Sequence, residues 1–107
     1  MIPTNIAVLR QKVIKLFLNC YINDKELQED LLYKDLVNNR GLLTLAIDFE
    51  RQLLRKHKKT DDRYKEDFRE RLGNLKDKKH PELKKRVLMK SLSVEKFVMC
   101  KIEDLAS

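Results

Sequence analysis

The chain has 107 residues, of which 42% are hydrophobic and 38% are charged, and its 24 Lys and Arg against 17 Asp and Glu give a net charge of +7. A chain of this length buries one compact core but hardly two, so we expect a single domain over residues 1–107. Only two Gly and two Pro occur, which is too few for the many turns of a β-sandwich or barrel and favours an all-α fold.

The two cysteines, Cys20 and Cys100, are far apart in the sequence and form no CxxC pair. We expect two small buried side chains in a reducing compartment, and a disulfide between them stays open only if the fold brings them together. No apolar run approaches the length of a membrane span, because Arg10, Lys12 and Lys15 interrupt the apolar residues near the N-terminus. The sequence therefore predicts a soluble and unprocessed protein.

The positive charge is concentrated in the middle of the chain. Residues 51–90 contain sixteen Lys and Arg against seven Asp and Glu, whereas residues 1–50 and 91–107 each have a net charge of −1. A solvated helix surface is the usual explanation of a lone basic patch. An excess of this size indicates an acidic partner at least as strongly, and that partner is either a protein or a nucleic acid.

The first half of the chain predicts two long amphipathic helices. The first runs from Asn5 to Tyr21, and its apolar positions, spaced three and four apart, are Ile6, Leu9, Val13, Leu16, Phe17 and Cys20. A less regular segment follows, with room for a short helix that Gly41 would end. The second long helix is expected from Leu42 to His57, with an apolar face made of Leu43, Ala46, Ile47, Leu53 and Leu54.

A third long helix is expected after Thr60 or Asp61, since a side-chain oxygen at either position can accept from free backbone N–H groups. Its apolar stripe consists of Tyr64, Phe68, Leu72 and Leu75. At about 100° per residue, burying this stripe leaves Lys65 and Arg69 together on an outward flank. The candidate binding residues are Lys65, Arg69, Arg71, Lys76, Lys78 and Lys79. A purely structural role remains the alternative for each one, and it is the interpretation we prefer for Lys84 and Lys85.

Two shorter helices are expected at the C-terminal end. Pro81 signals the start of one, because its missing N–H would have no partner there anyway, and Ser93 can cap the other. The predicted fold is a three-helix bundle with one or two short additional C-terminal helices. We expect its core to include Tyr64, Phe68, Leu72, Leu75, Leu83, Val87 and Phe97.

The residues from Tyr64 to Ser107, in the order YKxxxRxRLxNLKDxKxPxLKxxVLxxxLxxxxFxxxxxEDLAS, resemble the central domain of transcription elongation factor S-II (TFIIS) and of related chromatin-associated proteins. The most specific part is the Asn-Leu-Lys-Asp segment at residues 74–77, followed by Pro81, Leu83 and the Val87-Leu88 pair. Upstream, only the helix placement agrees. The resemblance implies a nuclear three-helix bundle that docks on RNA polymerase II, near the funnel rim and the jaw of the largest subunit.

In that family, basic residues on the third helix and just after it contact the polymerase. By position these are Lys65 and Arg69, with the basic residues of the following loop as weaker candidates. Asp67 stands where the family is usually basic, which predicts weaker or redirected binding. His80 stands where Asn is common, and the loss of that better cap should cost about 1 kcal/mol or less.

The family's transcript-cleavage activity resides in a zinc ribbon, which needs four ligands in two close pairs. Two isolated cysteines and two histidines, His57 and His80, do not supply such a set. We therefore expect no metal, no cofactor, histidines on the surface, and either a fragment or a minimal homologue without the ribbon. There is no Gly-rich phosphate loop and no nucleophile beside a base, so we do not expect an enzyme.

Two classes of binding function remain. The motif favours a polymerase-docking module, in an elongation factor or in a chromatin regulator of elongation. The alternative is direct binding of nucleic-acid phosphates without base readout, since few aromatics are available for stacking. We expect a monomer in the nucleus, with RNA polymerase II as the main partner, a weak nucleic-acid contact as the second, and no membrane contact.

Overall fold

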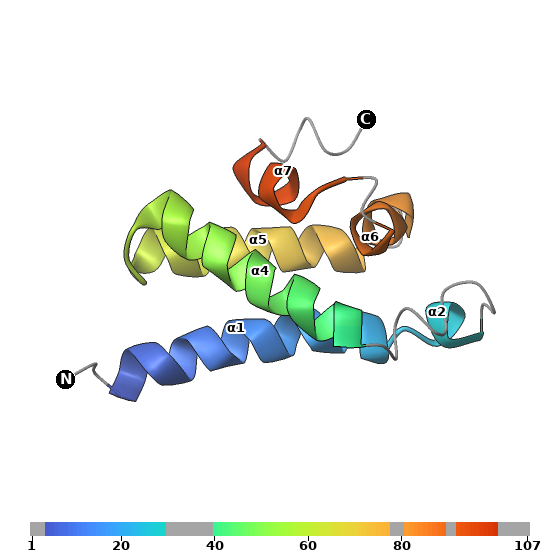
Figure 1. Cartoon of the computed structure of the whole chain (residues 1–107), viewed down its shortest axis with the longest axis horizontal. Helices are drawn as coiled ribbons and strands as arrows, with labels where there is room; N and C mark the ends of the chain where they lie inside the picture. The colour runs from blue at the N-terminus through green and yellow to red at the C-terminus, as the bar shows by residue number, and fades with distance from the viewer. Residues whose placement is uncertain (1–3, 30–39, 78–80, 90–91, 101–107) are drawn as a thin grey trace.

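The computed structural model describes residues 4–29, 40–77, 81–89 and 92–100. Its three long helices are α1 (Thr4–Ile22), α4 (Arg40–His57) and α5 (Asp62–Lys76). Helices α1 and α5 run in the same direction, and α4 runs in the opposite direction while packing against both (Figure 1). Helices are the only regular structure in these ranges, which confirms the predicted all-α three-helix bundle.

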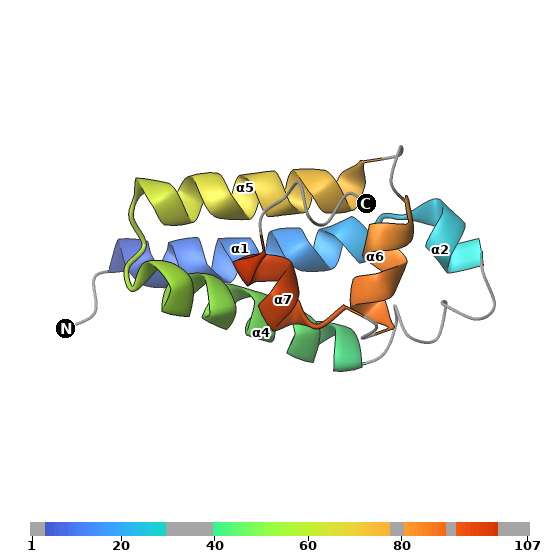
Figure 2. The same cartoon turned by 90° about the horizontal axis from the view of Figure 1, so that it is seen from above.

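Three shorter helices complete the described part of the fold. They are α2 (Lys25–Glu29), α6 (Pro81–Leu88) and α7 (Val94–Met99). Helix α7 packs on α4, and α6 lies across the C-terminal end of α5 (Figure 2). The two additional C-terminal helices are thus confirmed, as is Pro81 at the first position of α6. The prediction for Gly41 is wrong, because this residue lies in the first turn of α4 and not at the end of a preceding helix.

A chain of aromatic rings joins three helices at the centre of the core. The ring of Phe49 on α4 lies 4.9 Å from that of Phe17 on α1 and 5.8 Å from that of Phe97 on α7, centroid to centroid. All three side chains are fully buried. Contacts of this kind contribute about 1 kcal/mol beyond the burial of apolar area, so α7 is a part of the core and not a loose appendage.

The inward face of α4 differs from the predicted one. Ala46 and Leu53 are buried as expected, but Leu43 is 46% exposed. The buried positions that the periodicity did not select are Leu42, Leu45 and Phe49. Apolar residues occur in adjacent pairs along this helix, so the spacing alone fits two rotations. The packing of Phe49 on Phe17 selects one of them.

Both predicted N-caps are confirmed. The Asp61 carboxylate accepts a hydrogen bond from the backbone N–H of Tyr64 at 3.1 Å, and the Ser93 hydroxyl accepts one from Lys96 at 3.2 Å. The hydrogen bond from Tyr64 lowers the pKa of Asp61, since it stabilises the ionised carboxylate. These caps fix where α5 and α7 begin, and so fix which residues of α5 face outward.

Helix α6 is attached to the end of α1 through polar contacts. The hydroxyl of Tyr21 donates to the backbone oxygen of Lys84 at 2.9 Å, and the Lys84 ammonium lies 2.8 Å from the carboxylate of Asp24. Lys84 is 8% exposed. Its role is therefore structural, which is the interpretation that the sequence favoured.

Candidate interaction surface on helix α5

The apolar stripe of α5 determines which flanks of this helix meet solvent. Tyr64, Phe68, Leu72 and Leu75 are each at most 4% exposed. The structure places Leu83, Val87 and Phe97 in the same core. All of the predicted core residues therefore lie inside, and the charged residues between the four α5 positions must point sideways or outward.

Three basic residues of α5 share one flank, and we call Lys65, Arg69 and Lys76 the basic stripe. At about 100° per residue their directions fall within about 40° of one another. Arg69 and Lys76 are exposed and Lys65 is half-buried. None of the three forms an ion pair with a residue in the described ranges. Their charges are thus available to a partner.

The Arg69 side chain is oriented by the residue next to it. Its guanidinium carbon lies 5.8 Å from the centroid of the Phe68 ring, within the range of a cation–π interaction. Phe68 is itself buried, so the ring is a fixed platform. The contact limits the directions that Arg69 can take while leaving its N–H donors exposed, which favours binding a planar acidic group.

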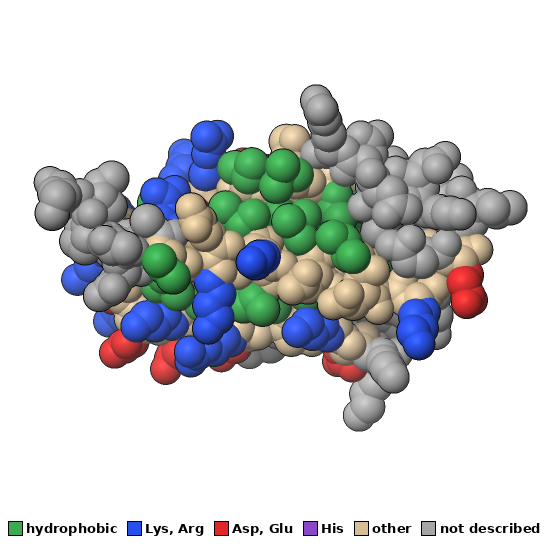
Figure 3. Space-filling view, turned by 90° about the horizontal axis from the view of Figure 1, so that it is seen from below, with side chains coloured by type: hydrophobic (Ala, Val, Ile, Leu, Met, Phe, Trp, Pro, Cys, Tyr) green, Lys and Arg blue, Asp and Glu red, His purple; other side chains and the backbone are tan. Residues whose placement is uncertain are grey.

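The last residue of the basic stripe, Lys76, lies toward α1. Burial raises the pKa of the Cys20 thiol on α1, and the positive charge of Lys76 opposes that rise, so Lys76 lies near the end of α1. Figure 3 shows the molecule from the α1 side, with Lys and Arg side chains at one end and along one edge, beside a region of hydrophobic side chains. The same view shows Asp and Glu side chains along its lower edge, so this face carries charges of both signs.

Arg71 does not belong to this surface. It is 3% exposed, its Nε donates to the Asp67 carboxylate at 3.0 Å, and one of its terminal nitrogens donates to the backbone oxygen of Phe97 at 2.9 Å. A guanidinium engaged in this way has no free donor on the outside of the bundle. We therefore remove Arg71 from the candidate binding residues and assign it a structural role.

Asp67 also points inward, which corrects the expectation that it faces a partner between Lys65 and Arg69. Its carboxylate lies 2.8 Å from the Lys56 ammonium and 2.7 Å from Nε2 of His57, in addition to Arg71. Burial alone would raise the pKa of Asp67, but these three hydrogen bonds outweigh it and hold the pKa below its ordinary value. The negative charge is matched inside the molecule.

His57 is not the surface histidine that the sequence suggested. Its side chain is only 14% exposed and is bonded to Asp67 at the end of α4. With Lys56, Asp67 and Arg71 it forms a polar cluster, which we call the Asp67 cluster. The helical periodicity of one segment cannot predict the Asp67 cluster, because its members come from both α4 and α5.

The Asp67 cluster also holds the end of α7. Lys56 donates to the backbone oxygen of Val98 at 3.0 Å, and Arg71 donates to that of Phe97. The last carbonyl groups of a helix have no partner within it and carry partial negative charge, so cations stabilise them. One buried carboxylate therefore positions two cations that anchor α7 to α4 and α5.

The burial of two charged residues could have been predicted from helical spacing, although the sequence analysis did not do so. Arg71 follows Phe68 by three residues and precedes Leu75 by four, so it falls within the apolar arc of α5. Glu50 falls in the same way between Ala46 and Leu53 on α4. It is 1% exposed and pairs with Arg10 of α1. A charge at a helical core position predicts a buried partner on another helix.

The remaining sequence predictions have these outcomes. Lys78, Lys79 and His80 lie outside the described residues. Cys20 and Cys100 are free thiols, the first buried and the second half-buried. Within the described ranges, no group of His, Cys, Asp and Glu side chains is arranged to hold a metal ion. None of the described helices has the length and apolar character that crossing a membrane requires.

Comparison with known protein families gives one match. The family described as transcription factor S-II (TFIIS), central domain, matches residues 7–107. The match includes α1 and α4, where the sequence resemblance rested on helix placement alone. No solved structure matches the chain.

Proposed function

Because the chain belongs to the family of TFIIS central domains, which bind RNA polymerase II in TFIIS, we propose that it is a polymerase-docking module that acts in the nucleus. Domains of this family bind the polymerase and do not themselves catalyse a reaction. The surface we propose for the contact is the basic stripe, and the site on the polymerase is the acidic region around the funnel rim and jaw of its largest subunit.

The observation that carries this proposal is the contrast between paired and unpaired cations. Arg10, Lys56, Arg71 and Lys84 all form ion pairs within the bundle. Lys65, Arg69 and Lys76 form none with the described residues and lie in line on one edge. Unpaired like charges repel one another in the free domain, and a complementary acidic surface removes that repulsion and speeds association.

The position of Asp67 strengthens the proposal. An outward carboxylate between Lys65 and Arg69 would repel an acidic partner. Asp67 instead accepts hydrogen bonds from Lys56, His57 and Arg71 behind the stripe, so its carboxylate does not lie on the outer surface between Lys65 and Arg69. We therefore expect no loss of affinity from the aspartate at this position.

Charge reversal tests the proposed contact. The variant Lys65→Glu/Arg69→Glu should retain at least tenfold less RNA polymerase II from nuclear extract than the parent. Two positive charges that attract an acidic surface become negative charges that repel it. A tenfold loss corresponds to binding weaker by about 1.4 kcal/mol. The neutral variant Lys65→Gln/Arg69→Gln should give an intermediate loss. Circular dichroism should show unchanged helix content for both.

The matched control is Lys15→Glu/Lys25→Glu, which changes the net charge equally at exposed residues of α1 and α2. It should retain polymerase nearly as well as the parent, since the changed charges lie on α1 and α2 and do not belong to the stripe. Equal retention by the stripe variant and the parent would show that the stripe is not the contact. Equal losses in the stripe variant and the control would show attraction by net charge alone.

A further inference from the structure

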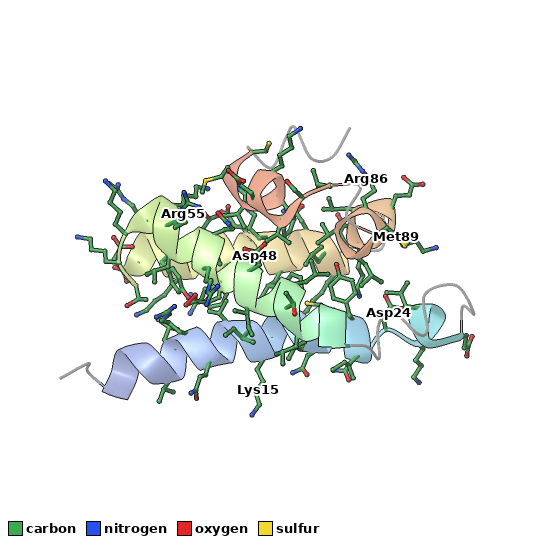
Figure 4. The ribbon with its side chains drawn as sticks, viewed as in Figure 1. Lys15, Asp24, Asp48, Arg55, Arg86 and Met89 are labelled. Atoms are coloured by element: carbon green, nitrogen blue, oxygen red, sulfur yellow. The ribbon has the colours of Figure 1, made fainter. Side chains whose placement is uncertain are left out.

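A second group of exposed cations surrounds the connection between α4 and α5. We call the five residues Arg51, Arg55, Lys58, Lys59 and Arg63 the hairpin cluster; all are exposed. Figure 4 shows Arg55 in the last turns of α4, close to this connection. The connection lies at the opposite end of α5 from Lys76 and α6 (Figure 1). The cluster is therefore a separate surface from the distal part of the basic stripe.

The positive charge of the hairpin cluster is not neutralised by ion pairs within the described part of the chain. None of the five cations forms an ion pair with any residue in the ranges that the structure describes. The acidic residues within 51–63 are Asp61 and Asp62, at the positive end of α5. Asp61 is occupied as the N-cap, although the charge of Lys59 also acts on it. The segment 51–63 still has six Lys and Arg against two Asp.

The arrangement is unfavourable for the isolated domain. Arg51 and Arg55 are four residues apart on one helix face, where like charges destabilise by about 0.2–0.5 kcal/mol. Lys58 has a φ of 65°, a left-handed conformation that glycine adopts far more readily than lysine. The helix would be more stable without the like-charged pair Arg51 and Arg55, and the turn would be more stable with glycine at position 58. A positive surface that destabilises the isolated domain is consistent with a role in binding.

The composition of the surface favours nucleic acid over an acidic protein. The exposed large hydrophobic residues of the described chain are Val8, Ile22, Leu43, Met89 and Met99, and none of them lies within residues 51–63. Protein interfaces have an apolar centre surrounded by a polar rim. Interfaces with nucleic acid are more polar and much more positive. Residues 51–63 themselves carry charge and no exposed large hydrophobic side chain, which fits the second class.

The same composition favours a duplex over a single strand. Proteins that bind single strands stack the bases on exposed aromatic side chains. Residues 51–63 contain no aromatic side chain other than His57, which is bonded to Asp67. A duplex keeps its bases stacked internally and presents phosphates, which Arg and Lys can bind without reading sequence. We propose that the hairpin cluster binds the phosphate backbone of duplex DNA without sequence preference.

This binding uses other residues than the proposed docking on the polymerase. A domain that holds the polymerase along α5 could hold nearby DNA with the α4–α5 connection. The two contacts would restrain each other's dissociation, because the second becomes an intramolecular event.

The test measures anisotropy of a labelled duplex of arbitrary sequence, about 25 base pairs long, between about 50 and 200 mM salt. The complete chain should bind at the low end and weaken steeply with salt. In the variant Arg51→Gln/Arg55→Gln/Arg63→Gln the slope of log K against log salt should become shallower by about 0.9 for each phosphate that is no longer neutralised. Its affinity at low salt should fall at least tenfold.

The matched control is Lys15→Gln/Lys25→Gln/Arg86→Gln, which removes the same number of positive charges from other surfaces. Lys15 points away from the bundle below α1, and Arg86 lies on α6 at the other end (Figure 4). This control should bind the duplex with nearly parental affinity. Equal losses in the two triple variants would overturn the inference, because they would show attraction by net charge alone.

Further arms separate this inference from the alternatives. The hairpin variant should still retain RNA polymerase II, and Lys65→Gln/Arg69→Gln should still bind the duplex. Loss of duplex binding in Lys65→Gln/Arg69→Gln but not in Arg51→Gln/Arg55→Gln/Arg63→Gln would overturn the inference. The docking proposal would still be decided by polymerase retention. Tighter binding of a single strand than of the duplex would also overturn it, as would displacement of the duplex by polyglutamate at equal charge concentration, which would indicate an acidic protein partner.

Discussion

At the scale of single residues, Asp67 has more influence on the fold than its position suggests. It is 9% exposed and accepts from Lys56, His57 and Arg71. Removing one member of a buried ion pair lowers stability strongly, because the partner charges stay buried with no opposite charge beside them. The residues that depend on Asp67 in turn hold the end of α7, so its loss should be felt in three helices.

We therefore expect Asp67→Asn to lower the free energy of unfolding by about 3 kcal/mol, as for other broken buried ion pairs. The amide keeps the shape of the carboxylate but loses the charge that balances Arg71. Urea unfolding followed by circular dichroism measures the loss. Glu66→Gln, an exposed neighbour on the same helix, should change stability by less than about 0.5 kcal/mol. A similar small change for Asp67→Asn would show that the cluster is not a significant source of stability.

The lowered pKa of Asp67 also predicts how stability depends on pH. Just below the ordinary value of 3.8, the unfolded chain takes up a proton that the folded carboxylate still excludes, so the free energy of unfolding falls as the pH falls. Above the ordinary value, the ionised Asp67 makes its full contribution to the free energy of unfolding. That contribution is lost as the pH falls through the lowered pKa of the folded state. The stability difference between the parent and Asp67→Asn should therefore shrink as the pH falls below about 4. A difference that grows on acidification would contradict this.

At the scale of helices, the sequence predicts where each helix lies in the chain better than it predicts which face of the helix is buried. Both bounds of α1 and α4, and the start of α5, lie within two residues of the expected ones, because caps and apolar spacing are local signals. The inward face of α4 was predicted less well. Leu42 and Leu43 are equally apolar, and only the contact between Phe49 and Phe17 tells which one is buried.

The candidate site shows the same limit. The alignment of Lys65 and Arg69 on one flank of α5 follows from helical geometry, since both lie outside the arc of Tyr64, Phe68 and Leu72. Arg71 falls within the apolar arc of α5, but the burial of Asp67 could not be derived from α5 alone. It depends on Lys56 and His57, which reach α5 from the end of α4. A feature shared between helices requires the tertiary structure.

The turn between α4 and α5 yields a prediction at this scale. Lys58→Gly should raise the free energy of unfolding by about 0.5 kcal/mol, because relief of the left-handed strain exceeds the greater freedom of glycine in the unfolded chain. Lys59→Gly removes the same charge at the adjacent exposed position, which has no positive φ, and should destabilise. Thermal unfolding of both variants makes the comparison. A loss of stability in Lys58→Gly equal to that in Lys59→Gly would show that Lys58 is unstrained.

At the scale of the whole molecule, the charge is arranged in two layers. Charges that are buried, such as Glu50, Asp67 and Arg71, are paired across helices. Among the described residues, the cations that form no ion pair include the basic stripe and the hairpin cluster, besides separate cations such as Lys15, Lys25 and Arg86. The inner layer stabilises the bundle, whereas the outer layer destabilises it by self-repulsion and serves the partners that we propose.

The two layers respond to salt differently, which gives a prediction for the complete chain. Salt screens exposed charges over a Debye length of about 10 Å at 0.1 M and affects buried pairs far less. With a net charge of +7, the melting temperature should therefore rise between about 10 and 150 mM salt, because repulsion is screened more than attraction. The rise should be smaller in Arg51→Gln/Arg55→Gln/Arg63→Gln, which has less repulsion to screen, than in the control that loses Lys15, Lys25 and Arg86. A melting temperature that falls with salt would mean that exposed ion pairs outweigh the repulsion, and the unpaired outer layer would then be the wrong description of this surface.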